Sequence, residues 1–107
     1  MDFVLPNAVA GYFAATNNGD RLVSFFTLTA TAFDENNLYR GPDEIDAWKQ
    51  AAREKFTYTV TPTGAQQLDD GSLLVTTRVE GDFKGSPVSL DHRFRLEDGL
   101  IAELVIS

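Results

Sequence analysis

The side chains that could do chemistry in this chain are few, and a single histidine, His92, stands among them. The sequence contains no cysteine. It therefore cannot form a thiolate nucleophile, a disulfide or a sulfur-ligated metal site, and one histidine excludes any metal site built from a histidine cluster. Ser86 is not in a nucleophile elbow, and the sequence has no phosphate loop, dinucleotide-binding turn or calcium loop. We expect no metal and no cofactor.

The composition predicts one globular domain covering residues 1–107. The chain has 43% hydrophobic and 23% charged residues, without a linker or an internal repeat. Sixteen acidic residues against nine basic ones give a net charge of −7, the wrong sign for holding a phosphate backbone. We therefore expect no nucleic-acid partner.

The first residues, Met1-Asp2-Phe3-Val4-Leu5-Pro6, carry an acidic group where a signal peptide carries positive charge. No run approaches the roughly 18 apolar residues that a membrane span needs, and no basic amphipathic segment is present. These features predict a soluble, cytoplasmic protein without a membrane partner.

Three helices are expected in the first half of the chain. Apolar residues at helical spacing predict a helix over about 6–17, and Asp20 begins a short second one that carries Leu22, Phe25 and Phe26. Pro42 opens the third helix, in which Ile45, Trp48, Ala52 and Phe56 share one face. The residues expected on the solvated faces of this helix are Lys49, Gln50, Arg53 and Glu54, and Asp43, Glu44 and Asp46 complement its dipole.

Short strands over about 29–34 and 38–40 form a hairpin around the polar turn 34–37. Alternating apolar and polar residues, separated by Asp-Gly and Gly-Ser-Pro turns, predict four long strands at about 56–66, 72–83, 87–96 and 100–106. The fold class is α+β: a cone-shaped curved antiparallel sheet, made of this four-strand meander and the short hairpin, wrapped on three helices. A bulge near Gly81 should add to the curvature.

Several motifs carry a family resemblance over nearly the whole chain. They are Tyr12-Phe13-Ala14-Ala15 with Asn18-Gly19-Asp20, then Phe26, Ala30-Thr31-Ala32-Phe33-Asp34, Tyr39-Arg40-Gly41-Pro42 with Ile45 and Trp48, and Phe94-Arg95-Leu96-Glu97-Asp98-Gly99-Leu100-Ile101. The sequence resembles the nuclear transport factor 2-like superfamily and, more closely, its SnoaL-like polyketide cyclase branch. That superfamily includes isomerases, dehydratases, cyclases and plain binding proteins, so the resemblance implies a fold more firmly than a function.

The resemblance to ketosteroid isomerases within this superfamily implies site residues. It matches their oxyanion-hole tyrosine with Tyr12, eight residues before Asp20, and their general-base aspartate with Asp34 at the end of the first strand. A third position falls on Asp91 or His92, depending on which neighbouring motif is aligned. The strand pleat selects His92 as the inward residue and departs from the isomerase pattern.

Each of these residues also has a structural interpretation. Asp34 leads into a polar turn, which favours a solvated strand end, and Tyr12 at an inward helix position is more often a core residue with a satisfied hydroxyl. His92 is as often a satisfied core residue as a catalytic one. If Asp34 instead faces an apolar cavity, burial should raise its pKa toward that of a proton-abstracting base.

The twelve aromatic residues suggest a cavity wall as well as a core. The residues expected to line the cavity are Phe13, Phe26, Tyr39, Trp48, Phe56, Tyr58, Val79, Phe83 and Phe94. We expect a cavity that binds a small hydrophobic molecule, with cofactor-free isomerase, cyclase or dehydratase chemistry by Asp34 as base, Tyr12 as donor and His92 as second donor or shuttle. The alternative is a non-catalytic ligand-binding or interaction module of the same fold. A homodimer through the outer sheet face is also expected.

Overall fold

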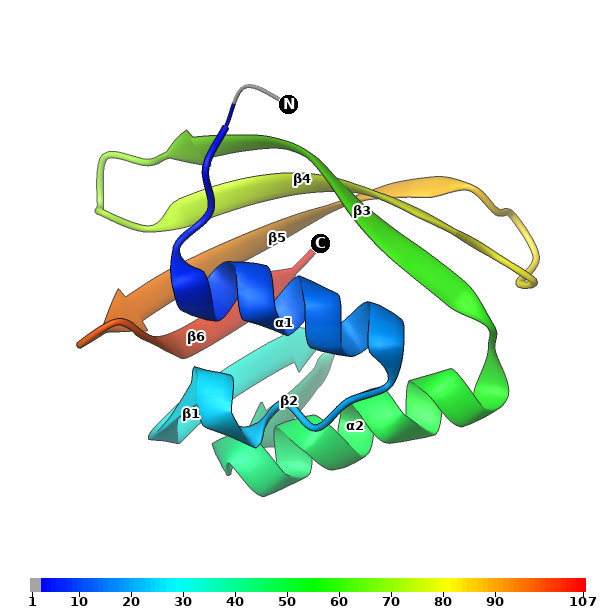
Figure 1. Ribbon diagram of the computed structural model, residues 1–107, viewed down its shortest axis with the longest axis horizontal. Helices are drawn as coiled ribbons and strands as arrows, with labels where there is room; N and C mark the ends of the chain where they lie inside the picture. The colour runs from blue at the N-terminus through cyan, green and yellow to red at the C-terminus, as the bar shows by residue number, and fades with distance from the viewer. Residues whose placement is uncertain (1–2) are drawn as a thin grey trace.

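The computed structural model describes residues 3–107 and places two α-helices across one face of a six-stranded sheet (Figure 1). The α+β class is confirmed. The elements in chain order are α1 (Asn7–Asn18), the 3-10 turn η1 (Val23–Phe25), β1 (Phe26–Asp34), β2 (Asn37–Arg40), α2 (Gly41–Lys55), β3 (Tyr58–Gln67), β4 (Leu73–Gly81), β5 (Val88–Glu97) and β6 (Leu100–Ile106). Within residues 3–107, no helix is both long and apolar enough to cross a membrane.

The strand order is β2-β1-β6-β5-β4-β3. All neighbours pair antiparallel except β1 and β6, which run parallel, so the expectation of a wholly antiparallel sheet was wrong at this junction. The hairpin of β1 and β2 therefore extends the sheet beyond β6. Asp34 at the end of β1 and His92 in β5 consequently belong to one continuous surface.

Two local predictions were wrong. The second helix is only the three-residue turn η1, and Phe26 belongs to β1, because the threonines that follow it favour an extended chain. Irregularities in strand register lie between Phe26 and Thr31 in β1, between Pro62 and Gly64 in β3 and between Arg95 and Leu96 in β5, rather than near Gly81. Gly81 instead allows a close backbone contact, since a Cβ there would lie 2.2 Å from the carbonyl oxygen of Thr57.

Helix α1 fills one half of the concave side with an aromatic cluster, which we define as Tyr12, Phe13, Phe26 and Phe94. All four side chains are buried, and their rings make edge-to-face contacts at centroid distances of 5.2 to 6.0 Å. This half of the concavity is therefore a packed core. The remaining space lies on the side of α2.

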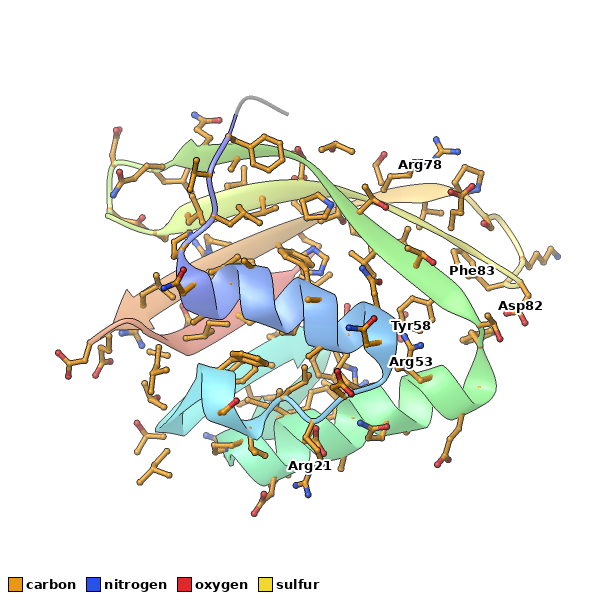
Figure 2. All side chains as sticks on the ribbon, in the orientation of Figure 1. Arg21, Arg53, Tyr58, Arg78, Asp82 and Phe83 are labelled. Carbon is orange, nitrogen blue, oxygen red and sulfur yellow. The ribbon has the colours of Figure 1, made fainter. Side chains whose placement is uncertain are left out.

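Side chains of α1 and α2 tie the helices to the rest of the fold. The Asn17 amide donates to the Val60 carbonyl oxygen and accepts from the Val60 N–H, both at 2.8 Å. The Arg53 guanidinium donates to the carbonyl oxygens of Thr16 and Asn17 at the end of α1 and lies over the Tyr58 ring, 5.6 Å from its centroid (Figure 2). Arg53 is therefore a structural contact and not the solvated residue that we expected.

Asp46 is also more than a partner for the helix dipole. It is buried, accepts a hydrogen bond from the Leu22 N–H at 2.8 Å and forms an ion pair with Arg21 at 3.0 Å. These contacts fix the chain between α1 and β1 against α2. They hold the segment that leads into β1.

Candidate functional site

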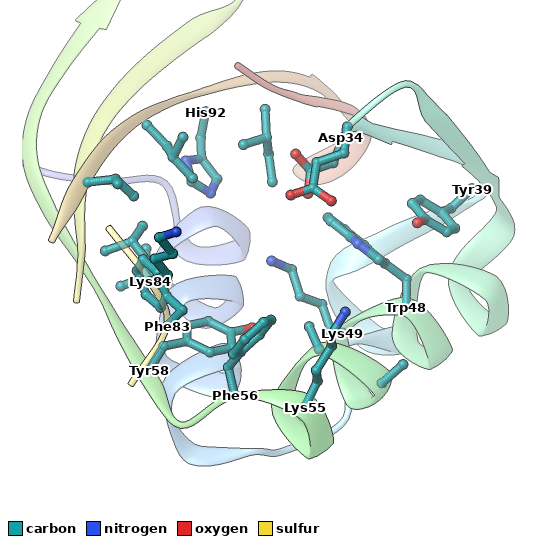
Figure 3. Close-up of a pocket in the computed structure, with 18 residues that line it drawn as sticks. Asp34, Tyr39, Trp48, Lys49, Lys55, Phe56, Tyr58, Phe83, Lys84 and His92 are labelled. Carbon is teal, nitrogen blue, oxygen red and sulfur yellow. The ribbon is translucent and has the colours of Figure 1, made fainter. Parts of the chain in front are cut away.

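A cavity of about 660 Å³ lies between α2 and the inner face of the sheet (Figure 3). The residues around it are mostly aromatic or apolar, with a few charged groups among them. It is lined by Asp34, Glu35, Tyr39, Trp48, Lys49, Ala51, Ala52, Lys55, Phe56, Tyr58, Val60, Val79, Phe83, Lys84, Val88, Leu90, His92 and Ile106. A volume in this range suits a small organic ligand.

Six of the nine residues predicted to form the wall do so: Tyr39, Trp48, Phe56, Tyr58, Val79 and Phe83. Tyr39 and Trp48 stack with centroids 4.9 Å apart, and Phe56 meets Phe83 edge to face at 6.1 Å. The other three, Phe13, Phe26 and Phe94, are not among the lining residues because they belong to the aromatic cluster under α1.

Asp34 ends β1 and lines the cavity as a half-buried residue. Burial is the main cause that raises the pKa of its carboxyl group. The neighbouring Glu35 raises it further, while Lys49 acts in the opposite direction. A carboxylate that is partly desolvated in this way is a stronger proton acceptor than one in water. Asp34 is therefore partly withdrawn from solvent and lies at the cavity.

His92 lies in β5, only 2% exposed, while its neighbour Asp91 is exposed, as the pleat predicts. Its ring packs on Phe13 at 5.3 Å and on Phe94 at 6.2 Å. Burial, followed by the positive charge of Lys49, lowers the pKa of His92 to about 3. The imidazole is therefore neutral at physiological pH and can exchange hydrogen bonds with a ligand in the cavity.

The surroundings of His92 also select its tautomer. The Thr77 hydroxyl donates its proton to the Leu90 carbonyl oxygen at 2.9 Å, and its oxygen lies 3.5 Å from His92 Nδ1. Since the hydroxyl has one proton, its oxygen can only accept from the ring. This arrangement favours a proton on Nδ1 and a lone pair on Nε2.

Tyr12 is not brought to the cavity. It is fully buried in the aromatic cluster, it is not among the lining residues, and its hydroxyl has no hydrogen-bond partner within residues 3–107. Burial raises the pKa of this phenol well above its ordinary value. The structure thus brings together Asp34 and His92, while the third residue that the resemblance suggested lies behind the wall.

Lys49 occupies the site instead. We expected it on the solvated face of α2, but it is only 7% exposed and its side chain points into the cavity between Asp34 and His92 (Figure 3). Its Nζ lies 4.3 Å from the Trp48 ring centroid and 5.5 Å from that of Tyr12. Burial lowers the pKa of Lys49 to about 8, against the opposing attraction of Asp34.

The helical spacing of the sequence already places Lys49 on the inward face of α2. Lys49 is four residues after Ile45, three before Ala52 and seven before Phe56, so it lies on the same face as these apolar residues. We predicted a solvated position for Lys49 because of its residue type and not because of its place in the helix. In a helix that lines a cavity, one cation within an apolar stripe is a signal for a site residue.

The cavity also concentrates positive charge. The chain has three lysines, Lys49, Lys55 and Lys84, and all three line it, together with the acidic Asp34 and Glu35. The lining residues thus carry a formal charge of +1 in a chain whose total is −7. Within residues 3–107, no three His, Cys, Asp or Glu side chains gather closely enough to hold a metal ion. The charges are suited to a polar or anionic group on an otherwise apolar ligand.

We compared the sequence and the fold with those of known proteins. No protein-family model and no curated protein matches the sequence. A candidate polyketide cyclase from Sinorhizobium meliloti is 35% identical, over 96% of this chain and 95% of that one, with a TM-score of 0.90.

Two further solved structures share the fold at lower identity. A protein with a ketosteroid isomerase-like fold from Catenulispora acidiphila, in complex with trimethylamine, is 21% identical over 97% of this chain and 86% of that one, with a TM-score of 0.81. A nuclear transport factor 2-like protein of unknown function from Cytophaga hutchinsonii is 12% identical over 100% and 93%, with a TM-score of 0.76. At these identities the likeness concerns the fold alone.

Proposed function

Since this chain belongs to the SnoaL-like polyketide cyclase branch of the nuclear transport factor 2-like superfamily, we propose that it binds a small hydrophobic carbonyl compound and catalyses cofactor-free proton transfer on it. The reaction would be an isomerisation, cyclisation or dehydration. The observation that carries this proposal is the presence of Asp34 and His92, from two different strands, on the wall of one aromatic cavity.

In the proposed mechanism, Asp34 removes a proton from the carbon next to the carbonyl group. The raised pKa of Asp34 matches such a base better than an ordinary aspartate, because proton transfer is most efficient when the base has a pKa closer to the working pH. The electron pair released from the C–H bond moves to the carbonyl oxygen and forms an enolate. Asp34 then returns its proton to the same molecule at another atom.

The developing negative charge on the enolate oxygen needs a stabilising partner. Tyr12 was expected in this role, but in the proposal Lys49 takes it, because its amine faces the cavity from the helix opposite Asp34. His92 offers the lone pair of Nε2 as a hydrogen-bond acceptor to a hydroxyl group of the ligand. The aromatic wall holds the apolar body of the ligand.

The Catenulispora acidiphila protein was solved with trimethylamine, a base that carries a positive charge at neutral pH. The rings of the present cavity could contact such a cation, but the three lysines that line it would repel one. We therefore propose a neutral or anionic ligand for this chain.

The test follows exchange of the protons beside the carbonyl group for deuterium, by NMR, over a panel of apolar ketones. Asp34→Asn should reduce the exchange rate at least about 100-fold, the usual contribution of a positioned general base. Glu35→Gln is the matched control, because it removes the adjacent, exposed carboxylate of the same cavity. Equal rates in wild type and Asp34→Asn would refute the assigned base. Ketone binding without any exchange would favour the non-catalytic binding module.

We also propose a homodimer through the outer sheet face. Leu38, Phe33 and Val105 lie directly opposite one another on β2, β1 and β6 and form an apolar row. Phe33 is 39% exposed and Leu38 43%. Phe33→Asp should shift the mass measured by light scattering from dimer to monomer, whereas Leu28→Asp, at an exposed site on the same strand, should not. A monomeric wild type at all concentrations would contradict this interface.

A further inference from the structure

The amine of Lys49, which is a nucleophile in its neutral form, lies on the wall of the cavity. We propose that the Lys49 amine captures the carbonyl group of the ligand covalently, as an iminium ion, so that the ligand is an aldehyde or an accessible ketone and not an ester or a lactone. This inference rests on the cavity of the proposed function and deepens it, but it does not require Asp34 to remove a proton from a carbon atom of the ligand.

The first support is the freedom of the amine. The ion pairs within residues 3–107 do not include Lys49, and neither do the side-chain hydrogen bonds of that range. The nearest ring, that of Trp48, contacts Nζ at 4.3 Å and offers no proton acceptor of its own. The nitrogen is therefore available to a ligand that enters the cavity.

The second support is the position of Lys49 relative to the other groups. Its side chain extends from α2 toward the space between Asp34 on β1 and His92 on β5 (Figure 3). Arg53, one helical turn further along α2, is engaged with the end of α1 and does not compete for the ligand. A carbonyl carbon bound to Nζ would thus face the sheet side of the cavity, which carries the carboxyl group of Asp34 and the neutral imidazole of His92.

The third support is the protonation state, which burial adjusts in the required direction. The charged groups that act on Lys49 are Asp34, which favours the ammonium ion, and Arg53, which opposes it, while His92 is neutral and adds no charge. With a pKa of about 8, about a tenth of the amine is neutral at pH 7, against about three parts in ten thousand for a lysine with the ordinary pKa. Lysines desolvated in apolar pockets form such adducts with carbonyl compounds.

The reaction is balanced without any additional reagent. The nitrogen lone pair forms a bond to the carbonyl carbon, the C=O π electrons move to oxygen, and a proton passes from nitrogen to that oxygen to give a carbinolamine. The protonated form of Asp34 donates a proton to the hydroxyl group, which leaves as water while the nitrogen lone pair completes the C=N bond. Hydrolysis reverses these steps and restores the amine.

The consequence for catalysis is a stronger electron sink. An iminium ion acidifies the neighbouring C–H bond more than a carbonyl group does, because its nitrogen already carries the positive charge that the developing enamine neutralises. Asp34, on the opposite wall, then removes a proton from a more acidic carbon. Lys49 is a catalytic residue in this description, since it bonds to the reacting molecule.

Reductive trapping tests the inference on the unmodified protein. We would incubate the protein with 4-phenyl-2-butanone and sodium cyanoborohydride, which reduces the iminium carbon and fixes the probe on nitrogen as a secondary amine. Peptide mass spectrometry then locates the label. Lys49 should be labelled at least tenfold faster than Lys55 and Lys84 at pH 7, and the advantage should disappear in urea. Equal labelling of the three lysines, or none at Lys49, would overturn the proposal.

A pair of variants separates this inference from the proposed function. Lys49→Arg keeps a positive charge but cannot form an imine, so it should lose both the label and most of the proton exchange. Full exchange activity in Lys49→Arg would overturn covalent capture while leaving Asp34 as the base. Conversely, Asp34→Asn should still be labelled at Lys49 after long incubation, and unchanged proton exchange in that variant refutes the proposed function alone.

Discussion

Lys49→Met should make the protein more stable at neutral pH although it removes a group from the site. Lys49 is 7% exposed, and its amine lies near the rings of Tyr12 and Trp48. Within residues 3–107 it forms no ion pair with a carboxylate. Methionine keeps most of the length of the side chain and removes the charge. A buried cation replaced by an apolar side chain of similar volume is commonly neutral or stabilising.

The magnitude follows from the lowered pKa of Lys49. The ordinary value is 10.5 and the value in the fold is about 8. At about 1.4 kcal/mol for each pKa unit, keeping the ammonium ion in the folded state at pH 7 costs about 3 kcal/mol relative to the unfolded chain. Methionine should recover part of this free energy, and we expect a gain of about 1 to 3 kcal/mol in unfolding free energy at pH 7.

The pH dependence shows whether the buried charge of Lys49 is the cause of the stabilisation by Lys49→Met. Between pH 8 and 10.5 the unfolded chain binds a proton at Lys49 that the folded chain has released, so this group increases wild-type stability as the pH rises through that window. Lys49→Met lacks the increase, and its advantage at pH 10 should fall to less than about 1 kcal/mol. Comparing the two proteins at each pH cancels the contributions of tyrosines, whose titration both proteins share.

Urea unfolding followed by tryptophan fluorescence and circular dichroism, at pH 7 and pH 10, measures both values. Lys55→Met is the control, because Lys55 lies on the same helix and is exposed, and it should change stability by no more than about 0.5 kcal/mol. A loss of stability in Lys49→Met at pH 7 would refute the reasoning. An equal gain at both pH values would show that packing, and not charge, is responsible.

Three further outcomes follow from the same structure. The ring protons of His92 should not titrate by NMR between about pH 5 and 8, because burial and Lys49 lower its pKa to about 3; an inflection near neutral pH would mean a hydrated ring. Asp46→Ala should lower the unfolding free energy measured in urea by about 1 to 3 kcal/mol, because it leaves the buried Leu22 N–H without its acceptor; no loss would show that water replaces the carboxylate. Gly81→Ala should cost about 1 to 3 kcal/mol in the same assay, since its Cβ would lie 2.2 Å from the Thr57 carbonyl oxygen, and an unchanged midpoint would show that β3 moves away at little expense.

The backbone elements followed closely from local patterns where those patterns were strong. The strands β3, β4, β5 and β6 begin and end within a few residues of the prediction, because period-two alternation and Asp-Gly turns are short-range signals. The parallel contact between β1 and β6 had no such signal. It joins segments about 70 residues apart in sequence, and their pairing depends on the whole sheet.

The site was predictable to the extent that it depends on strand geometry. The pleat placed His92 inside and Asp91 outside, whereas Asp34 came from the family resemblance, and its orientation could not be derived from the strand that it ends. Periodicity also identified Phe13 and Phe94 as inward residues, but it cannot distinguish an open cavity from a packed core. That distinction depends on where α1 lies, which is a tertiary property.

The amide of Asn17 has an effect on how copies of this chain meet in solution. β3 is an edge strand, and exposed edges attract further strands from other molecules. At Val60 both backbone groups of that edge are occupied by Asn17, and two residues later Pro62 has no N–H to offer on the same side. A second chain therefore finds no continuous row of free backbone groups along this part of β3, which disfavours the pairing of another strand there.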